Sequence, residues 1–226
     1  MDDRDQAKRL AARAALELLP DSGVVGLGSG STAKLFIDEV GELVRDGRRL
    51  VGVATSQASR RQATDLGIPL LDDEGPWLID VCVDGADEVS SELDLIKGGG
   101  GCQTREKIVN FSSKLNVIIV DESKLSARLG EKWPVPLEIL AFGRLATVAR
   151  LGEFGEVRLR ERKGAAWRSD AGNYLYDLNV GPISNPGKLD QALRSVPGVV
   201  ETGLFCGRAD RVIVAGAAGV SQMRRG

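Results

Sequence analysis

Apolar and polar positions along the first part of the chain predict strands and helices in alternation. Apolar residues recur at helical spacing over roughly 3–19, and a short apolar run at 24–27 leads through a glycine-rich loop into a second helical pattern at 32–44. The alternation continues over 50–54, 57–66, 78–83, 104–112 and 116–120. Repeated strand and helix units predict a parallel sheet with helices on both faces, in which ligands bind beyond the carboxyl ends of the strands.

From about Pro134 the pattern changes to that of a smaller α+β unit. The expected elements are a strand, a helix, two strands, a helix and a strand, at 135–140, 144–151, 155–160, 173–180, 186–194 and 199–205. This β-α-β-β-α-β order is that of a ferredoxin-like unit, and a further strand at 211–215 could return to the main sheet. We therefore predict an α/β fold with a Rossmann-like domain over 1–133 and 207–226 and a ferredoxin-like domain over 134–206.

The amino-acid composition excludes some kinds of catalytic and binding site but says little about the fold. Hydrophobic residues make up 42% and charged residues 27%, with a net charge of -2, which is ordinary for a folded domain and gives no basic arm for nucleic acid. The chain has no histidine, which removes the commonest general base and the commonest zinc ligand. Catalysis would fall to carboxylates, lysines or thiols.

The cysteines and the N-terminus indicate a cytoplasmic protein. Cys82, Cys102 and Cys206 lie far apart, with neither a metal-binding spacing nor an even number for a disulfide framework. The acidic residues after Met1 are not followed by the apolar core of a signal peptide, and no later apolar run approaches the ~18 residues of a membrane span.

The loop Gly28-Ser29-Gly30-Ser31-Thr32 follows a predicted strand and opens a predicted helix. Free N–H groups and the helix dipole favour an anion at such a position, although a tight turn alone would also explain the glycines. A dinucleotide site is disfavoured because the next strand end, 50–56, lacks the expected acidic residue, and no Gly-Lys-Ser/Thr is present for a nucleotide phosphate loop. The loop predicts phosphate binding.

Two further segments place charged groups where this architecture binds ligands. Asp84-Gly85-Ala86-Asp87-Glu88 brings three carboxylates to the end of a predicted strand, as a ligand site, a solvated acidic turn or a magnesium site would. Lys97 precedes four glycines, which form either a flexible linker or, because such a run is otherwise costly, a loop that turns sharply or approaches a ligand. Glu106 then lies in the first turn of the next helix, as a general base or as a surface ion-pair partner.

In this order, the segments at 28–32, 84–88, 97–100, 104–107 and 121–124 resemble those of ribose-5-phosphate isomerase of type A. Further similar segments are Trp133–Glu138, Asp170–Asn173 and Pro197–Phe205, so the resemblance covers nearly the whole chain. Two departures are Ser29, where threonine is frequent in the family, and Gly101-Cys102-Gln103, where small apolar residues are frequent. These departures affect the expected mobility of the glycine loops and the expected sensitivity of the protein to thiol reagents.

The resemblance implies an aldose–ketose isomerisation of ribose 5-phosphate and ribulose 5-phosphate, in the non-oxidative pentose phosphate pathway, through an enediolate and without a metal or organic cofactor. It makes Glu106 the base that moves a proton between C2 and C1. Asp84 and Asp87 would bind sugar hydroxyls and assist ring opening or proton transfer at the oxygens, and Lys97 would stabilise the enediolate oxygen. The residues expected to line the substrate site are Ser29, Gly30, Ser31, Thr32, Gly85, Ala86, Gly98, Gly99, Gly100 and Lys124, with Lys8 as a further candidate cation.

The same resemblance implies a homodimer or homotetramer without nucleic-acid or membrane partners. Rival hypotheses are a non-catalytic sugar-phosphate sensor, an amino-sugar-phosphate deaminase and an acyl transferase with a glutamate nucleophile. A sensor of this kind usually carries a DNA-binding segment, for which the roughly twenty residues before the first strand are too few. A deaminase would be expected to bring a catalytic histidine, which this chain lacks.

Overall fold

The computed structural model describes residues 3–225, which divide into two compact units. The first unit holds the chain up to Ala86, the segment Arg105–Lys124 and the chain from Arg208 onward, and the second holds Asp87–Thr104 and Leu125–Gly207. This division gives 87–104 and 125–133 to the second unit, whereas our sequence-based boundaries, which stay a prediction, place them in the first domain. In the described part of the chain, no helix has the length and apolar character needed to span a membrane.

The first unit is built on a sheet of parallel strands with one antiparallel edge. The strand order is β15-β14-β6-β3-β1-β2, and only the β14–β15 pair is antiparallel. The bounds are β1 (Ser22–Leu27), β2 (Arg49–Ala54), β3 (Ile79–Asp84), β6 (Ser113–Asp121), β14 (Arg211–Gly216) and β15 (Gly219–Arg224). The predicted return of the last strand to the main sheet is confirmed, because β14 pairs with β6. The edge strand β15 was not predicted.

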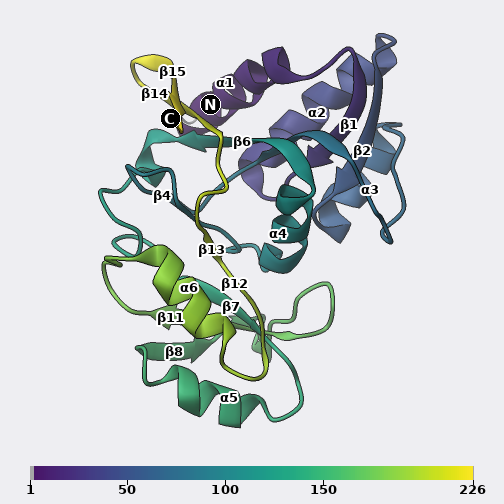
Figure 1. Cartoon of the computed structure of the whole chain (residues 1–226). Helices are drawn as coiled ribbons and strands as arrows, with labels where there is room; N and C mark the ends of the chain where they lie inside the picture. Colours follow the sequence, from purple (N-terminus) through teal and green to yellow (C-terminus); the bar gives the residue numbers. More distant parts are fainter. Residues whose placement is uncertain (1–2, 226) are drawn as a thin grey trace. The chain divides into compact units, whose positions relative to one another are not determined.

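Helices cover both faces of this sheet, as predicted. The helices are α1 (Asp3–Ala15), α2 (Ser31–Arg45), α3 (Gln57–Asp65) and α4 (Gln103–Phe111). Buried residues of α1, α2 and α3 share one core with Val81 and Val83 of β3. Val109 of α4 packs instead with Cys82, whose side chain alternates to the opposite face of the strand. Figure 1 shows α1 and α2 side by side.

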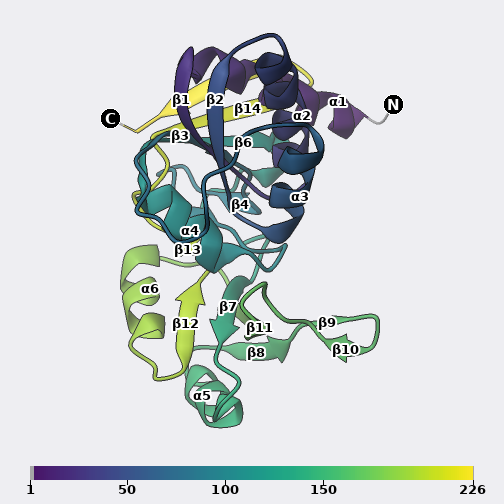
Figure 2. The same ribbon diagram turned by 90° about the vertical axis from the view of Figure 1, so that its right-hand side faces the viewer.

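The second unit has the predicted ferredoxin-like order. Its antiparallel sheet runs β12-β7-β11-β8, and helices α5 and α6 pack against the sheet through Leu151 and Leu193. The bounds are β7 (Val135–Ile139), α5 (Arg144–Leu151), β8 (Glu156–Leu159), β11 (Tyr174–Asn179), α6 (Pro186–Arg194) and β12 (Val199–Thr202). The chain order β7-α5-β8-β11-α6-β12 with this strand order is the ferredoxin-like topology (Figure 2).

Short elements depart from the prediction. The strand predicted over 199–205 is interrupted at Gly203 and continues as β13 (Leu204–Phe205), which joins β5 (Leu95–Ile96) and β4 (Glu88–Val89) in a small separate sheet. A hairpin of β9 (Glu161–Arg162) and β10 (Ala165–Ala166) extends from the second unit (Figure 2). The first helix ends at Ala15 and continues as a 3-10 turn, η1 (Leu16–Leu18); a second 3-10 turn, η2 (Glu122–Lys124), follows β6.

Candidate active site

Asp84 joins two of the predicted segments at the carboxyl end of the main sheet. Strands β1 and β3 are parallel neighbours, so their ends meet, and Asp84 is only 3% exposed there. Its Oδ1 accepts hydrogen bonds from the backbone N–H groups of Ser29, at 2.9 Å, and Gly85, at 2.7 Å. A Cβ on Gly28 would lie 2.3 Å from that oxygen, so the loop passes the carboxylate as closely as only glycine allows.

A cluster of hydroxyl groups, not singled out from the sequence, fixes the same loop. Ser29 Oγ lies 2.7 Å from Thr55 Oγ1 and 2.8 Å from Ser56 Oγ, both of which follow β2. Ser59 Oγ donates to the carbonyl of Gly28 at 2.6 Å. The rule that ligand sites gather at strand ends could have pointed to Thr55 and Ser56, but isolated hydroxyl residues form no motif of their own.

Helix α2 begins directly after this loop and favours an anion at its first turn. Gly30 occupies the N-cap position at φ +98°, a left-handed conformation that suits glycine, and no side chain of the described residues caps the helix. The first turn contains no acidic residue. Gly30 and Ser31 are exposed, whereas Thr32 is buried. The helix dipole therefore meets solvent beside Ser31, as the phosphate-binding hypothesis requires.

Glu106 is a buried acid in the first turn of α4, with 5% exposure. This burial argues against a surface ion pair with its neighbours. Arg105 turns to Asp73, with Nη2 2.6 Å from Oδ2. Burial raises the pKa of Asp73, but the hydrogen bonds from Arg105 and Arg60 outweigh it, so the pKa lies below its ordinary value.

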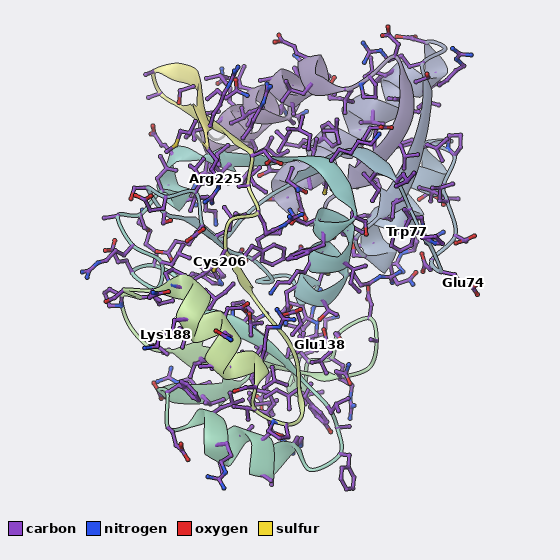
Figure 3. All side chains as sticks on the ribbon, viewed as in Figure 1. Glu74, Trp77, Glu138, Lys188, Cys206 and Arg225 are labelled. Atoms are coloured by element: carbon purple, nitrogen blue, oxygen red, sulfur yellow. The ribbon has the colours of Figure 1, made fainter. Side chains whose placement is uncertain are left out.

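The start of α4 is held by a buried carboxylate on β7, Glu138, which is labelled in Figure 3. Its Oε2 accepts from Thr104 Oγ1 at 2.5 Å, and its Oε1 accepts from Ser169 Oγ at 2.6 Å and from Asn173 Nδ2 at 2.8 Å. Thr104 lies in the first turn of α4, as does Glu106. Charged hydrogen bonds of this kind fix the side chain of Thr104.

The remaining candidate cations of the first unit lie on separate elements. Lys124 ends η2 after β6 and is partly buried. Lys8 lies on α1, where its Nζ is 3.6 Å from Asp5 Oδ1, one turn earlier on the same helix. Lys8 therefore neutralises a carboxylate of its own helix.

In the second unit, the structure brings Asp87 and the four-glycine loop together. Asp87 Oδ2 accepts the N–H of Gly99 at 2.6 Å, and the Asp87 N–H donates to Ile96 at 2.9 Å. A Cβ on Gly99 would lie 2.7 Å from Asp87 Oδ1. The glycine run is therefore an ordered loop that approaches the carboxylate, and the flexible-linker alternative does not apply.

Lys97, which precedes this loop, carries a buried ammonium. The residue is 3% exposed, its Nζ lies 5.5 Å from the centre of the Phe205 ring, and its N–H donates to Gly203 at 2.9 Å. The face of an aromatic ring attracts a cation. A positive charge held in a dry environment can stabilise an oxyanion more strongly than one in water.

Glu88, the third carboxylate of the acidic segment, has a structural role. It is 0% exposed, and its two oxygens accept the backbone N–H groups of Gly130 at 2.9 Å, Lys132 at 3.0 Å and Trp133 at 3.3 Å. Within 3–225, no three or more His, Cys, Asp or Glu side chains are grouped to hold a metal ion. The carboxylates at 84–88 therefore do not form one ligand set.

Comparisons with known proteins show which family the chain belongs to. Residues 51–219 match the family model of ribose 5-phosphate isomerase A (phosphoriboisomerase A). The chain is 47% identical to a ribose-5-phosphate isomerase A of Gloeobacter violaceus, over 96% of each chain. The chain belongs to the ribose 5-phosphate isomerase A family. The resemblance seen in the sequence is thus confirmed.

Solved structures of the family share the whole fold. A ribose 5-phosphate isomerase A from Methanocaldococcus jannaschii is 38% identical, covers 97% of this chain and 98% of its own, and superposes with a TM-score of 0.91. A D-ribose-5-phosphate isomerase in complex with phospho-erythronic acid reaches a TM-score of 0.95 at 37% identity, with 98% and 99% coverage. The α/β fold class is confirmed, whereas the roles of individual site residues stay predictions.

Proposed function

We propose that this chain interconverts D-ribose 5-phosphate and D-ribulose 5-phosphate. The observation that carries the proposal is its 47% identity to a ribose-5-phosphate isomerase A over 96% of both chains. The chemistry of the chain agrees, since a proton next to a carbonyl is removed by one base and the resulting charge is stabilised by one electrophile. In a chain without histidine, Glu106 and Lys97 supply these two groups.

The mechanism starts from the open-chain aldose. Glu106 takes the proton from C2, the electron pair moves toward the carbonyl, and an enediolate forms. Lys97 stabilises the negative charge on its oxygen, and Asp84 and Asp87 pass the proton of the C2 hydroxyl to O1. Glu106 then returns its proton to C1 as the C2 carbonyl of the ketose forms. Asp84 and Asp87 bind the sugar hydroxyls and assist ring opening.

The phosphate of the substrate is bound through the loop Ser29–Thr32 and the uncapped start of α2, with Lys124 as a cation. The solved relative in complex with phospho-erythronic acid supports a ligand of this class, because that compound combines a phosphate with a carboxylate. A carboxylate resembles the planar, negatively charged enediolate. We propose that this chain binds the same class of ligand.

The reaction proceeds without a divalent metal, in a cytoplasmic homodimer or homotetramer that has no nucleic-acid or membrane partner. An enediolate needs fixed donors and cations when no metal is present, and Lys97 and the backbone N–H groups of the glycine loops are such groups.

The experiment is to incubate the pure chain with ribose 5-phosphate in EDTA and follow the ketose by NMR. Turnover should persist in EDTA, and free ribose should have a kcat/KM lower by far more than about tenfold, since the phosphate's binding energy positions the reacting end. A Glu106→Gln variant should lose roughly 10²–10⁴-fold in kcat. It should still bind a phosphorylated substrate analogue within a few-fold, because the amide keeps the shape of the acid.

No ketose from the wild-type chain would refute the proposed function. Activity lost in EDTA and restored by one divalent ion would refute the metal-free mechanism. A folded Glu106→Gln enzyme that keeps more than a tenth of the wild-type kcat would move the base to Asp84 or Asp87.

A further inference from the structure

Arg160 is a buried cation that none of the sequence motifs includes. It follows β8 directly, and its side chain is 8% exposed. Asp177 on β11 accepts two parallel hydrogen bonds from it, at 2.8 Å from Nε and 2.5 Å from Nη2. This two-point pairing fixes the plane of the guanidinium and therefore the direction of its remaining donor, Nη1.

That remaining donor contacts the four-glycine loop. Nη1 of Arg160 lies 2.7 Å from the carbonyl oxygen of Gly98 and 3.4 Å from that of Gly99. The Gly98 oxygen also accepts the N–H of Gly101 at 2.8 Å, which closes the loop into a turn. Arg160 thus holds the carbonyl side of the loop immediately after Lys97.

Because of the geometry of the peptide bond, this contact also fixes the direction of the N–H groups in the glycine loop. The C=O and N–H of a trans peptide point in opposite directions, and the peptides of this loop are trans. Because the Gly98 carbonyl points to Arg160, the N–H of Gly99 points away from it and meets Asp87 Oδ2 at 2.6 Å. The Gly99 carbonyl likewise directs the N–H of Gly100 away from Arg160. The Gly98 and Gly99 carbonyls therefore face Arg160, and the Gly99 N–H faces Asp87.

We infer that Arg160 is a positioning residue for the isomerase reaction, acting through the glycine loop on Asp87. The inference rests on the proposed function, in which Asp87 binds the sugar hydroxyls. Without the guanidinium, the peptides at Gly98 and Gly99 can rotate, and Asp87 loses the N–H that fixes its carboxylate. A contribution to stability alone would not explain the pair, because the Asp177 side chain is 28% exposed and ion pairs that reach solvent add little stability.

The test compares Arg160→Met and Arg160→Lys with Arg158→Met. Arg158 lies two residues away, with a side chain that is 74% exposed and pairs with Glu156, so it is a matched control. The kcat of both Arg160 variants, measured per folded enzyme, should fall roughly ten- to a hundredfold. Lysine cannot form the two parallel hydrogen bonds that arginine makes to Asp177, and small misplacements of groups at an active site are costly. Arg158→Met should stay within twofold. Wild-type kcat in Arg160→Lys would overturn the inference.

A double-mutant cycle with Asp87→Asn separates positioning from general destabilisation. If Arg160 acts through Asp87, Arg160→Met combined with Asp87→Asn should be at most about threefold slower than Asp87→Asn alone, since coupled residues are not additive. If the double variant instead loses kcat by the product of the two single losses, the inference is wrong, while the isomerase assignment still holds.

Amide exchange gives a readout that needs no turnover. In Arg160→Met, the Gly99 N–H should exchange with solvent at least about tenfold faster than in the wild type, because its bond to Asp87 is no longer enforced. An unchanged Gly99 rate in a folded variant would overturn the inference. An inactive wild-type chain with the expected exchange would instead refute the proposed function.

Discussion

Replacing Glu88 by glutamine tests whether the third acid of the acidic segment stabilises the fold or takes part in the reaction. The carboxylate is fully buried and accepts three backbone N–H groups, from Gly130 and Trp133 on Oε2 and from Lys132 on Oε1. Glutamine has the same shape but only one acceptor oxygen. With that oxygen toward Gly130 and Trp133, its NH₂ group faces the N–H of Lys132, donor against donor.

The size of the loss follows from these contacts. One buried N–H without a partner costs about 1–3 kcal/mol, and two hydrogen bonds weaken by about 1 kcal/mol each when the acceptor loses its charge. Relief of the burial cost of the carboxylate offsets part of this, which leaves a loss of roughly 2–4 kcal/mol. At ~2–4 °C per kcal/mol for a chain of this size, the midpoint of thermal unfolding should fall by roughly 5–15 °C.

Thermal unfolding followed by circular dichroism measures this shift, with Glu92→Gln as the control, because Glu92 is an exposed glutamate of the same unit. At 25 °C the kcat of folded Glu88→Gln should stay within about threefold of the wild type. Asp87→Asn should show the opposite pattern, with little change in unfolding temperature and a large loss of kcat. A Glu88→Gln variant that unfolds within 1 °C of the wild type but loses more than tenfold in kcat would refute the structural role.

Three further variants test other features by thermal unfolding or turnover. Gln103 is 0% exposed, and among residues 3–225 neither its Nε2 nor its Oε1 has a hydrogen-bond partner. Gln103→Met should therefore raise the unfolding midpoint by a few degrees, and a lower midpoint would contradict this reasoning. Hydrogen bonds from Lys114 and from the Val24 N–H lower the pKa of Asp80. The Asp80 carboxylate therefore stabilises the fold at a pH above its unfolded-state pKa of about 4. This stabilisation is lost as the pH falls through the folded-state pKa of Asp80. Asp80→Asn should thus lower the midpoint at pH 7 and progressively less below pH 4; an effect independent of pH would contradict this. Cys102 lies beside the glycine loop, with Sγ 3.6 Å from the Gly100 carbonyl. The Cys102→Ser variant should turn over substrate as fast as the wild type and should not be slowed by a maleimide. If the maleimide slows both proteins equally, the sensitive thiol lies elsewhere.

Elements defined by local interactions were predictable from the sequence, and those defined by distant pairing were not. Helix α6 has the predicted bounds because its signals are adjacent in the chain: Asn185 caps it and Pro186 opens it. The strand predicted over 199–205 breaks at Gly203, where a Cβ would lie 2.3 Å from the Lys97 carbonyl oxygen. That contact, like the pairing of Leu204 with Ile96, joins residues far apart in the sequence. The hairpin β9–β10 pairs two exposed charged residues with two alanines, and its sequence carries no alternation of apolar and polar positions.

The site shows the same limit. The segments that carry Ser29, Asp84 and Asp87 were found because glycine runs and strand ends leave a local pattern. Arg160 could not be found in this way, since it lies 62 positions from Gly98 and a single arginine near a strand end has many possible partners. The pattern shows which residues flank a loop, but only the fold shows which side chain holds it.

The place of β14 late in the chain has a consequence for unfinished protein. Its residues Arg211–Ala215 pair in parallel with β6 from Val117 to Asp121, and β15 then forms the outer edge. Until β14 is synthesised, the apolar strand β6 has an open edge of unpaired N–H and C=O groups, which is a template for pairing with other chains. A product of premature termination before residue 211 is therefore not a smaller version of the same sheet. It is an aggregation-prone fragment that the cell must remove or shield. Strands β14 and β15 therefore decide whether the rest of the first unit stays in solution.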